Sequence, residues 1–192
     1  MKINRPKFYE NFRKLFGKLN QKQVEGFEAI FNEWEKQKLI DARWLAYMLA
    51  TAWHETDRTM QPIEEIGRGK NYKYGKKIKR SGVAYKPPEK LYYGRGLVQL
   101  TWFENYQLMA RLLKVDLLNK PELALQMDIS IKIMFEGMLR GSSSFGDFTG
   151  KCLEMYFNDE VDNPVAARKI INGTDKAELI AQHHNIFLKC LK

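Results

Sequence analysis

The chain has 192 residues, of which 44% are hydrophobic and 12% aromatic, and this composition excludes a disordered protein and suits one well-buried domain. Its net charge of +9 favours contact with an anionic polymer, namely nucleic acid, an acidic membrane surface or a cell wall, without choosing among them. No run approaches the roughly 18 apolar residues of a membrane-spanning helix, and the first residues lack the continuous apolar core of a secretory signal. We therefore expect a single domain over residues 1–192, made in the cytoplasm and without a membrane span.

Two amphipathic or buried helices are predicted in the first third of the chain. Asn20 is a plausible helix cap, and apolar residues follow it at three- and four-residue spacing: Val24, Phe27, Ile30, Phe31 and Trp34. Asp41 should cap a second helix that runs from Ala42 to about Glu55. This second helix has a broad apolar surface, which predicts burial on most sides.

The buried helix ends in a His-Glu pair, His54 and Glu55. A helix C-terminus and apolar surroundings both disfavour an ionised carboxyl group, so the pattern predicts a raised pKa for Glu55 and a role as proton donor. Two further carboxylates, Glu64 and Glu65, follow about ten positions later and could supply a general base. The spacing alone equally suits ordinary surface glutamates. A His-Glu-x-x-His zinc site is excluded because its fifth position is Arg58, and we expect no metal and no cofactor.

Residues 58–95 are rich in glycine and are predicted to form a long loop with short strands at most. Its cations are interleaved with tyrosines and comprise Arg68, Lys70, Lys73, Lys76, Lys77, Lys79, Arg80, Lys86 and Lys90. Two interpretations stay open, a solvated mobile lobe and a surface that contacts a polymer.

The second half of the chain is predicted to be helical. Two capping boxes, Thr101 with Glu104 and Asp175 with Glu178, should begin helices, the first of them running to about Lys114. Asp128 should cap an apolar helix that Gly141 ends, and a short helix should follow near residues 151–157. Pro164 should lie in the first turn of another helix, which ends at Asn172 and Gly173. Cys152 and Cys190 lack metal-ligand spacing and are expected to be reduced, partly buried thiols.

A signature in the middle of the chain points to a family. Residues 93–101, Tyr-Gly-Arg-Gly-Leu-Val-Gln-Leu-Thr, resemble the Tyr-Gly-Arg-Gly-x-x-Gln-Leu-Ser/Thr signature of glycoside hydrolase family 19. Trp53-His54-Glu55-Thr56 is similar to the Ala-His-Glu-Thr box of that family, and Ile171-Asn172-Gly173 resembles its Ile-Asn-Gly motif. The resemblance spans roughly residues 42 to 190, and residues 1–40 form an N-terminal helical extension outside it.

The resemblance implies a mainly α, lysozyme-like domain of two lobes, one of them built from a long loop or short strands. It assigns the catalytic acid to Glu55, the second carboxylate to Glu65 rather than Glu64, and the positioning of water to Thr101. The choice between the two carboxylates is one of alignment, because Asp57, Arg58 and Thr59 replace two glycines of the family pattern.

The remaining site residues are assigned to substrate binding: His54, Tyr93, Arg95, Gln99, Asn105 and Asn172. Gln99, Asn105 and Asn172 offer neutral donors and acceptors for sugar hydroxyl and acetamido groups. His54 is expected to orient its neighbours rather than donate a proton, and Arg95 is either a buried strut or a ligand contact. For Thr101 and Asn172 the structural alternatives are a helix cap and a turn residue. His183 and His184 are expected to be surface or packing residues.

Together these features predict a monomeric glycoside hydrolase that cleaves β-1,4 linkages of peptidoglycan and acts on the cell wall after release or export. Peptidoglycan is preferred to chitin because the chain is compact, basic and without a disulfide framework. A chitinase is the alternative within the class. A non-catalytic module that binds cell wall or nucleic acid is the alternative from another class, although no nucleic-acid partner is expected for the enzyme.

Overall fold

The computed structural model describes residues 1–86, 90–139 and 148–192. Within them the α-helices are α1 (Arg5–Leu15), α2 (Gln21–Lys36), α3 (Ala42–Glu55), α4 (Phe103–Leu113), α5 (Met127–Leu139) and α6 (Ala177–Leu191). The two strands, β1 (Ile63–Glu64) and β2 (Arg95–Gly96), pair antiparallel. Four 3-10 helices complete the described elements: η1 (Tyr74–Lys76), η2 (Pro121–Leu125), η3 (Leu153–Met155) and η4 (Ala166–Ile170). The predicted mainly α class with short strands is confirmed.

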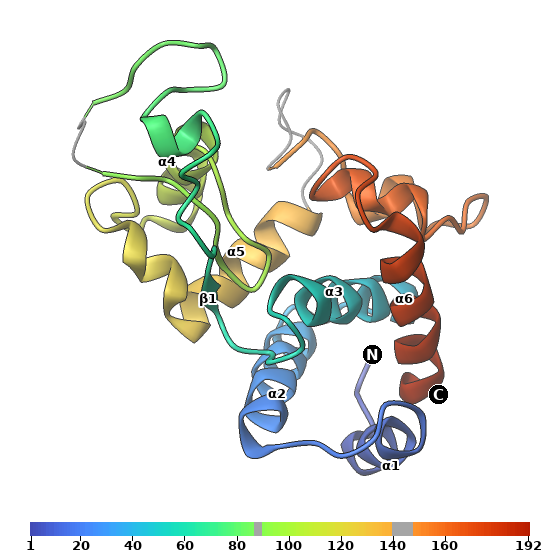
Figure 1. Cartoon of the computed structure of the whole chain (residues 1–192). Coiled ribbons are helices and arrows are strands. Elements are labelled where there is room, and N and C mark those ends of the chain that lie inside the picture. Colours follow the sequence, from blue (N-terminus) through green and yellow to red (C-terminus); the bar gives the residue numbers. More distant parts are fainter. Residues whose placement is uncertain (87–89, 140–147) are drawn as a thin grey trace.

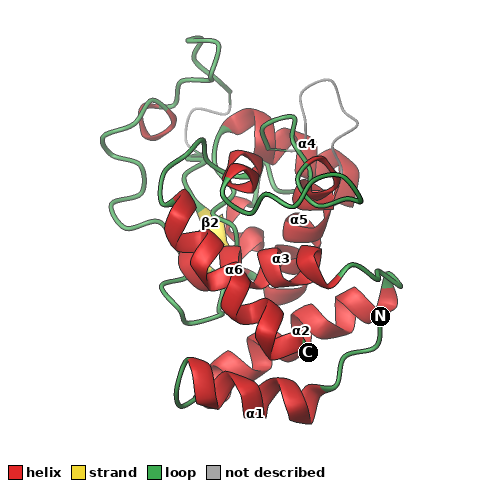
Figure 2. Cartoon of the chain, turned by 90° about the vertical axis from the view of Figure 1, so that its right-hand side faces the viewer, coloured by secondary structure: helices red, strands yellow, loops and turns green. Residues whose placement is uncertain are grey.

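The elements form two lobes (Figures 1 and 2). Helices α1, α2, α3 and α6 make one lobe, and the loop-rich part with β1, β2 and α4 makes the other. Helix α5 connects them, because it contacts both α4 and α2. None of the helices in the described ranges is long and apolar enough to cross a bilayer.

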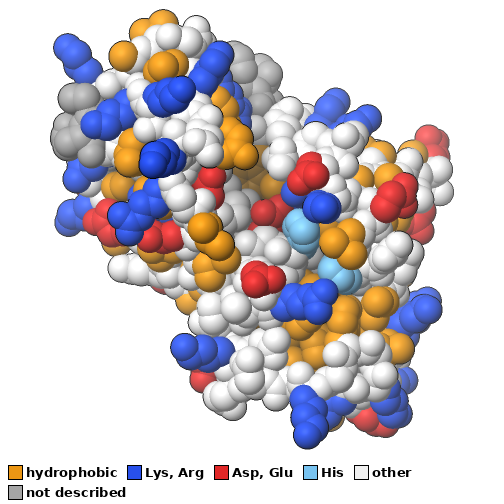
Figure 3. Space-filling model, viewed as in Figure 1, with side chains coloured by type: hydrophobic (Ala, Val, Ile, Leu, Met, Phe, Trp, Pro, Cys, Tyr) orange, Lys and Arg blue, Asp and Glu red, His pale blue; other side chains and the backbone are white. Residues whose placement is uncertain are grey.

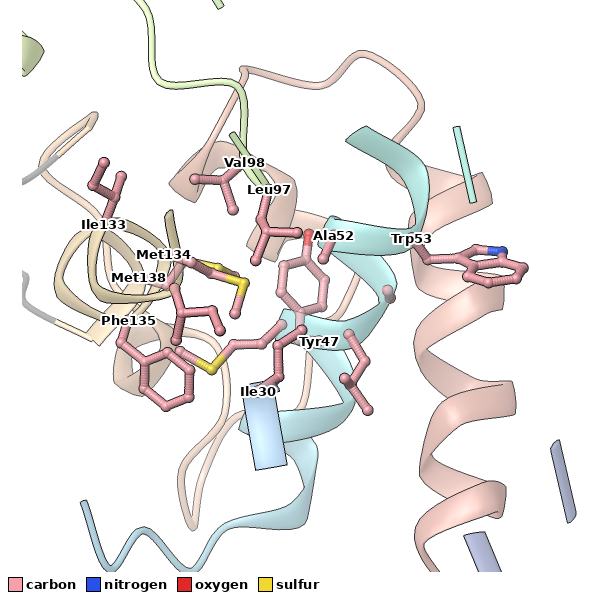
Figure 4. Packing of buried hydrophobic residues seen from close by; sticks show 14 of the residues in the cluster. Ile30, Tyr47, Ala52, Trp53, Leu97, Val98, Ile133, Met134, Phe135 and Met138 are labelled. Atoms are coloured by element: carbon pink, nitrogen blue, oxygen red, sulfur yellow. The ribbon is translucent and has the colours of Figure 1, made fainter. Parts of the chain in front are cut away.

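Helix α3 is the centre of the hydrophobic core. The side chain of Asp41 accepts a hydrogen bond from Arg43 N at 2.8 Å and begins the helix at the predicted residue. Every residue from 45 to 53 is buried. In Figure 4, Tyr47 and Ala52 lie toward the side chains of α5 and of Leu97, whereas Trp53 points the opposite way, toward α6. Burial of each large apolar side chain contributes about 1.5–3 kcal/mol to the free energy of folding. Because the side chains of α3 pack in both directions, this helix holds the two lobes together.

The N-terminal extension belongs to the same core. Phe12 of α1 lies 5.3 Å from Phe27 of α2 and 5.5 Å from Trp53 of α3, measured between ring centroids. Phe16 lies 4.8 Å from Phe187 of α6. These edge-on and tilted contacts are favourable beyond the burial of area. Residues 1–40 therefore support α3 and α6 rather than standing apart from them.

Two predicted capping boxes are wrong. Helix α4 begins at Phe103 after Trp102, which has a φ of 78° and makes no capping bond through its side chain. The hydroxyl of Thr101 donates to Gln99 O at 2.7 Å, and Glu104 accepts from Arg80 N at 2.8 Å. Helix α6 likewise begins after Lys176, in a left-handed conformation and without a side-chain cap. At the start of α4, the side chains of Thr101 and Glu104 form hydrogen bonds with other groups, and the partner of Glu104 is distant in the sequence.

Other predicted boundaries need smaller corrections. Asp128 lies in the first turn of α5 rather than at its cap, and the predicted end of that helix at Gly141 lies outside the described residues. The helix after Pro164 is the short 3-10 helix η4, where Asn163 accepts a hydrogen bond from Ala166 N at 2.9 Å. The predicted helix near residues 151–157 is the 3-10 helix η3.

Both cysteines are free and buried, as predicted, and burial raises the pKa of the Cys190 thiol to about 12. His183 and His184 are buried too, which selects the packing role over the surface role.

The buried imidazole of His184 should make stability depend on pH. Its ring stacks on Phe157 at a centroid distance of 5.1 Å and lies 5.8 Å from the ring of Tyr47. Burial lowers the pKa of His184 to about 4 from 6.5. The unfolded state therefore binds more protons between these two values, so the stability present above pH 6.5 is lost as the pH falls toward 4.

We expect His184→Phe, which keeps the aromatic contact, to remove about 2 kcal/mol of the stability loss that the natural chain shows between pH 7 and pH 5. Urea unfolding of both proteins at the two pH values measures this. Equal pH dependence of the two proteins would show that His184 is not the responsible group.

Candidate active site

A pocket of about 530 Å³ opens between the two lobes. Of the predicted site residues it is lined by Glu55, Glu65, Gln99, Thr101, Asn105 and Asn172. Figure 3 shows the molecule hollowed between the loop-rich lobe and the rest. Three predicted substrate-binding residues, His54, Tyr93 and Arg95, are not part of the pocket lining.

Glu65 is held by the backbone of the signature segment. Glu65 N donates to Gly94 O at 2.8 Å, and Gly94 N donates to Glu65 Oε2 at 2.9 Å. The hydroxyl of Tyr74 donates to the other carboxylate oxygen, Oε1, at 2.8 Å. Burial and this hydrogen bond both raise the pKa of Tyr74, so the phenol stays a donor. Glu65 is thus fixed from two directions.

The glycines of the signature are required by close packing. A Cβ on Gly94 would lie 2.6 Å from Gln99 Oε1 and 3.3 Å from Glu65 Cβ. Gly96 has a φ of +90°, and a Cβ there would lie 2.6 Å from Ser130 Oγ. This serine accepts a hydrogen bond from Leu97 N at 2.7 Å. A side chain at either glycine would push apart the turn that holds Glu65 and Gln99.

Glu64 has a different environment from Glu65. It accepts a hydrogen bond from the hydroxyl of Tyr93 at 2.6 Å and lies 3.4 Å from the guanidinium of Arg68. The tyrosine hydrogen bond, with Arg68 and Arg95 nearby, lowers the pKa of Glu64. Arg68 therefore pairs with Glu64 and not with Glu65. Glu64 is absent from the pocket lining.

Arg95 is a buried strut, which is one of its two predicted roles. Its side chain donates to Leu91 O and to the hydroxyl of Tyr106, both at 3.0 Å. The guanidinium carbon lies 3.6 Å from the centroid of the Tyr93 ring, and Nε lies 3.6 Å from Glu64. Because Arg95 is 5% exposed and both it and Tyr93 face Glu64, these two residues support the loop rather than line the pocket.

Arg168 is the main site residue that the sequence analysis missed. Its Nη1 donates to Glu55 Oε1 at 2.6 Å, and its Nε donates to Asp175 O at 2.8 Å. Glu55 therefore lies against a buried guanidinium, which corrects the prediction of apolar surroundings that disfavour an ionised carboxyl group. A usable signal existed, since Arg168 lies four residues before Asn172 of the Ile-Asn-Gly motif.

His54 lies beside Glu55 at the end of α3. Burial lowers the pKa of its imidazole, the nearby carboxylate of Glu55 acting in the opposite direction. A neutral imidazole outside the pocket suits the predicted orienting role better than direct substrate contact.

The neutral polar groups of the pocket are differently engaged. Gln99, with a φ of 53°, donates from its side chain to Ile63 O and Gly96 O, both at 3.1 Å. The Asn105 amide is 7% exposed and makes no side-chain hydrogen bond to the described part of the chain. Asn172 is exposed on the opposite wall. Asn105 and Asn172 can therefore bind a ligand without losing an internal bond.

Aromatic residues form a wall beside Glu65 that the sequence analysis did not assign to the pocket. The rings of Tyr72 and Tyr74 stack at 5.1 Å with an interplanar angle of 11°, and Trp102 meets Tyr74 edge-on at 5.1 Å. All three residues line the pocket. Flat aromatic surfaces next to polar groups are typical of sites that bind sugar rings or other amphipathic ligands.

The two-lobed helical fold, with a carboxylate from each lobe in the pocket, agrees with the predicted lysozyme-like fold class. No family model matches the chain. An endochitinase from Arabidopsis thaliana is 40% identical over 86 residues, which is 44% of this chain and 30% of the relative. The chain thus spans less than a third of the length of that relative.

A bacterial family 19 chitinase of known structure has a TM-score of 0.58 to this chain at 21% sequence identity, covering 95% of this chain and 93% of the other. The protein has the fold of that chitinase. In sequence motifs and in fold the chain resembles glycoside hydrolase family 19, which confirms the predicted resemblance.

The two predicted roles of Thr101 can now be separated. Its hydroxyl makes no capping bond, so Thr101→Ala should change the free energy of unfolding by no more than about 1 kcal/mol. Because Thr101 lines the pocket and its hydroxyl oxygen can still accept a hydrogen bond from water, we expect Thr101→Ser to stay active. Thr101→Ala should lose on the order of 10²-fold in turnover on a chitin oligosaccharide, since a nucleophile misplaced by about 1 Å costs that much. Full turnover by folded Thr101→Ala would limit Thr101 to a structural role.

Proposed function

We propose that this protein is a glycoside hydrolase that cleaves β-1,4 linkages of an N-acetylhexosamine polymer, with Glu55 as general acid and Glu65 as general base. The observation that carries the proposal is the placement of two carboxylates from separate lobes in one pocket. Both similar proteins are named as chitinases, and chitinases are glycoside hydrolases.

Glu55 has one carboxylate oxygen held by a cation and the other without a protein partner among the described residues. Arg168 engages Oε1, whereas Oε2 makes no hydrogen bond to the described residues and can face the glycosidic oxygen of a substrate. In the proposed reaction the carboxyl proton of Glu55 passes to the glycosidic oxygen as its bond to C1 breaks. Arg168 fixes the direction in which the carboxyl group faces.

Glu65 has the contacts that a general base needs. Tyr74 and Gly94 N each donate to one oxygen, and each oxygen keeps a lone pair that can accept a hydrogen bond from water. The water gives a proton to Glu65 while its oxygen bonds to C1 of the sugar. Thr101 lies in the same pocket and is proposed to hold that water.

Peptidoglycan is the proposed polymer, and chitin is the alternative. The net charge of +9 favours the carboxylate-bearing wall polymer over neutral chitin. The names of the two similar proteins favour chitin. We propose further that the protein is a monomer that acts on the cell wall after release or export.

Digestion of purified sacculi and of colloidal chitin, with mass analysis of the soluble fragments, tests the choice of polymer. Disaccharide-peptide fragments from sacculi support peptidoglycan, whereas release of N-acetylglucosamine oligomers from chitin alone supports the alternative. Binding without cleavage of either polymer would favour a non-catalytic wall-binding module.

Three glutamine variants test the assignment of the carboxylates. Glu55→Gln and Glu65→Gln should each lower turnover by about 10²–10⁴-fold, because general acid and base catalysis contribute that much. Glu64→Gln is the matched control, since its side chain faces Tyr93 and lies outside the pocket lining, and it should keep most of its activity.

The measurement is the initial rate on soluble oligosaccharides of peptidoglycan and of chitin, with circular dichroism to confirm that each variant is folded. A severe loss in Glu64→Gln together with a mild one in Glu65→Gln would reverse the assignment.

A further inference from the structure

Almost all of the net charge of the chain lies in one segment beside the pocket. Residues 66–86 form a segment of the loop-rich lobe, and we name this segment the basic lobe. It contains eight Lys or Arg residues and no Asp or Glu. The rest of the chain then holds 24 basic and 23 acidic residues and is nearly neutral. The charge is therefore a local feature and not a property of the whole surface.

The basic lobe has a defined backbone. Successive turns join Lys70 N to Gly67 O at 3.0 Å and Tyr72 N to Gly69 O at 2.8 Å, and Ile78 bridges to Ala84. A Cβ on Gly75 would lie 1.9 Å from Gly69 O, so the chain packs closely on itself here. The lobe is anchored to the pocket through the Tyr74 hydrogen bond to Glu65. Of the two alternatives left by the sequence, these contacts disfavour a mobile, unanchored lobe.

The cations of the lobe divide into two groups. Arg68 pairs with Glu64, Lys79 lies 4.4 Å above the ring of Phe103, and Arg80 lies 5.5 Å from the ring of Trp102. The others make no ion pair with the described residues: Lys70, Lys73, Lys76, Lys77 and Lys86. All of these except the half-buried Lys77 are exposed. Figure 3 shows Lys and Arg side chains gathered over the loop-rich lobe, next to the hollow.

Like charges held this close repel one another, and no acidic side chain within the lobe relieves the repulsion. An anionic ligand would relieve it. The unpaired groups are all lysines, whose compact hydrated charges suit carboxylates at irregular spacing. Both arginines of the lobe, which could bind phosphate bidentately, already contact Glu64 or Trp102.

We propose that the basic lobe is a docking surface for the free carboxylates of the peptide stems on a cell-wall glycan strand. It would hold the strand while a neighbouring part of the same polymer occupies the pocket, to which Tyr72, Tyr74 and Arg80 of the lobe contribute. This inference rests on the proposed function and adds to it the means by which a charged polymer is chosen over a neutral one.

The test compares two variants of equal charge. The first carries Lys→Gln at the exposed lobe residues 70, 73, 76 and 86, and the control carries Lys→Gln at exposed residues 18, 22, 189 and 192, which lie outside the lobe and the pocket lining. Co-sedimentation with purified sacculi at low salt should show about tenfold weaker binding for the lobe variant and less than about twofold for the control. High salt should abolish the difference. Equal weakening of both variants would overturn the proposal, because only net charge would then matter.

Modified sacculi identify the anionic group. Amidation of the carboxylates should remove the advantage of the natural chain over the lobe variant, whereas removal of phosphodiester-linked polymers should leave it unchanged. The opposite pattern would overturn the assignment to carboxylates. Preferential binding of duplex DNA over sacculi, lost in the lobe variant alone, would also overturn it in favour of a nucleic-acid surface.

Hydrolysis of a short neutral chitin oligosaccharide separates this proposal from the proposed function. Both variants should keep the turnover of the natural chain, because the substituted lysines do not line the pocket. If the natural chain itself cleaves no glycan but its binding still depends on the lobe, the enzymatic proposal fails while the docking surface stands. If turnover of the oligosaccharide falls with the lobe variant alone, the lobe acts in the pocket and the docking role is wrong.

Discussion

The position of Glu55 depends on a buried guanidinium. Arg168 is 2% exposed, and it donates hydrogen bonds to Glu55 Oε1 and to Asp175 O. Burying a charged pair is costly, and such pairs are often no more stabilising than well-packed apolar residues. A pair at the wall of a pocket is better explained by the geometry that it imposes. It joins the end of α3 to η4, so that Glu55 and the motif residue Asn172 both line the pocket.

The opposite wall is organised by the backbone rather than by charge. The turn of the signature segment is closed by reciprocal hydrogen bonds between Arg95 and Leu100, at 3.2 Å and 2.8 Å. Its glycines let Glu65, Gln99 and Ser130 approach the chain more closely than any side chain would allow. The two carboxylates thus differ in support, one held by a cation and the other by neutral donors.

The sequence predicted those helix boundaries that residues next to them in the chain determine. The starts of α2 and α3 were predicted to the residue, because Asn20 and Asp41 cap their own helices. The predictions at Thr101 and Asp175 failed because Thr101 and Glu104 bond to other groups and because a residue with positive φ precedes each helix. The pairing of Arg168 with Glu55 joins residues 113 positions apart, so helical periodicity carries no trace of it. The distinction between Glu64 and Glu65 rested on an alignment, and their burial and partners became visible only in the fold.

Under the two proposals, the pocket that holds Glu55 and Glu65 cleaves the glycan, and the basic lobe beside it holds the strand. The central claim is that Glu65 acts on a water molecule rather than on the sugar, which requires inversion at the anomeric carbon. Proton NMR of soluble oligosaccharides of peptidoglycan and of chitin during the first minutes of hydrolysis measures this directly. We expect the new reducing ends to appear as the α-anomer and then to equilibrate. Initial formation of the β-anomer would contradict the assignment of Glu65 as a base, and the absence of any new reducing end would contradict the assignment of the pocket.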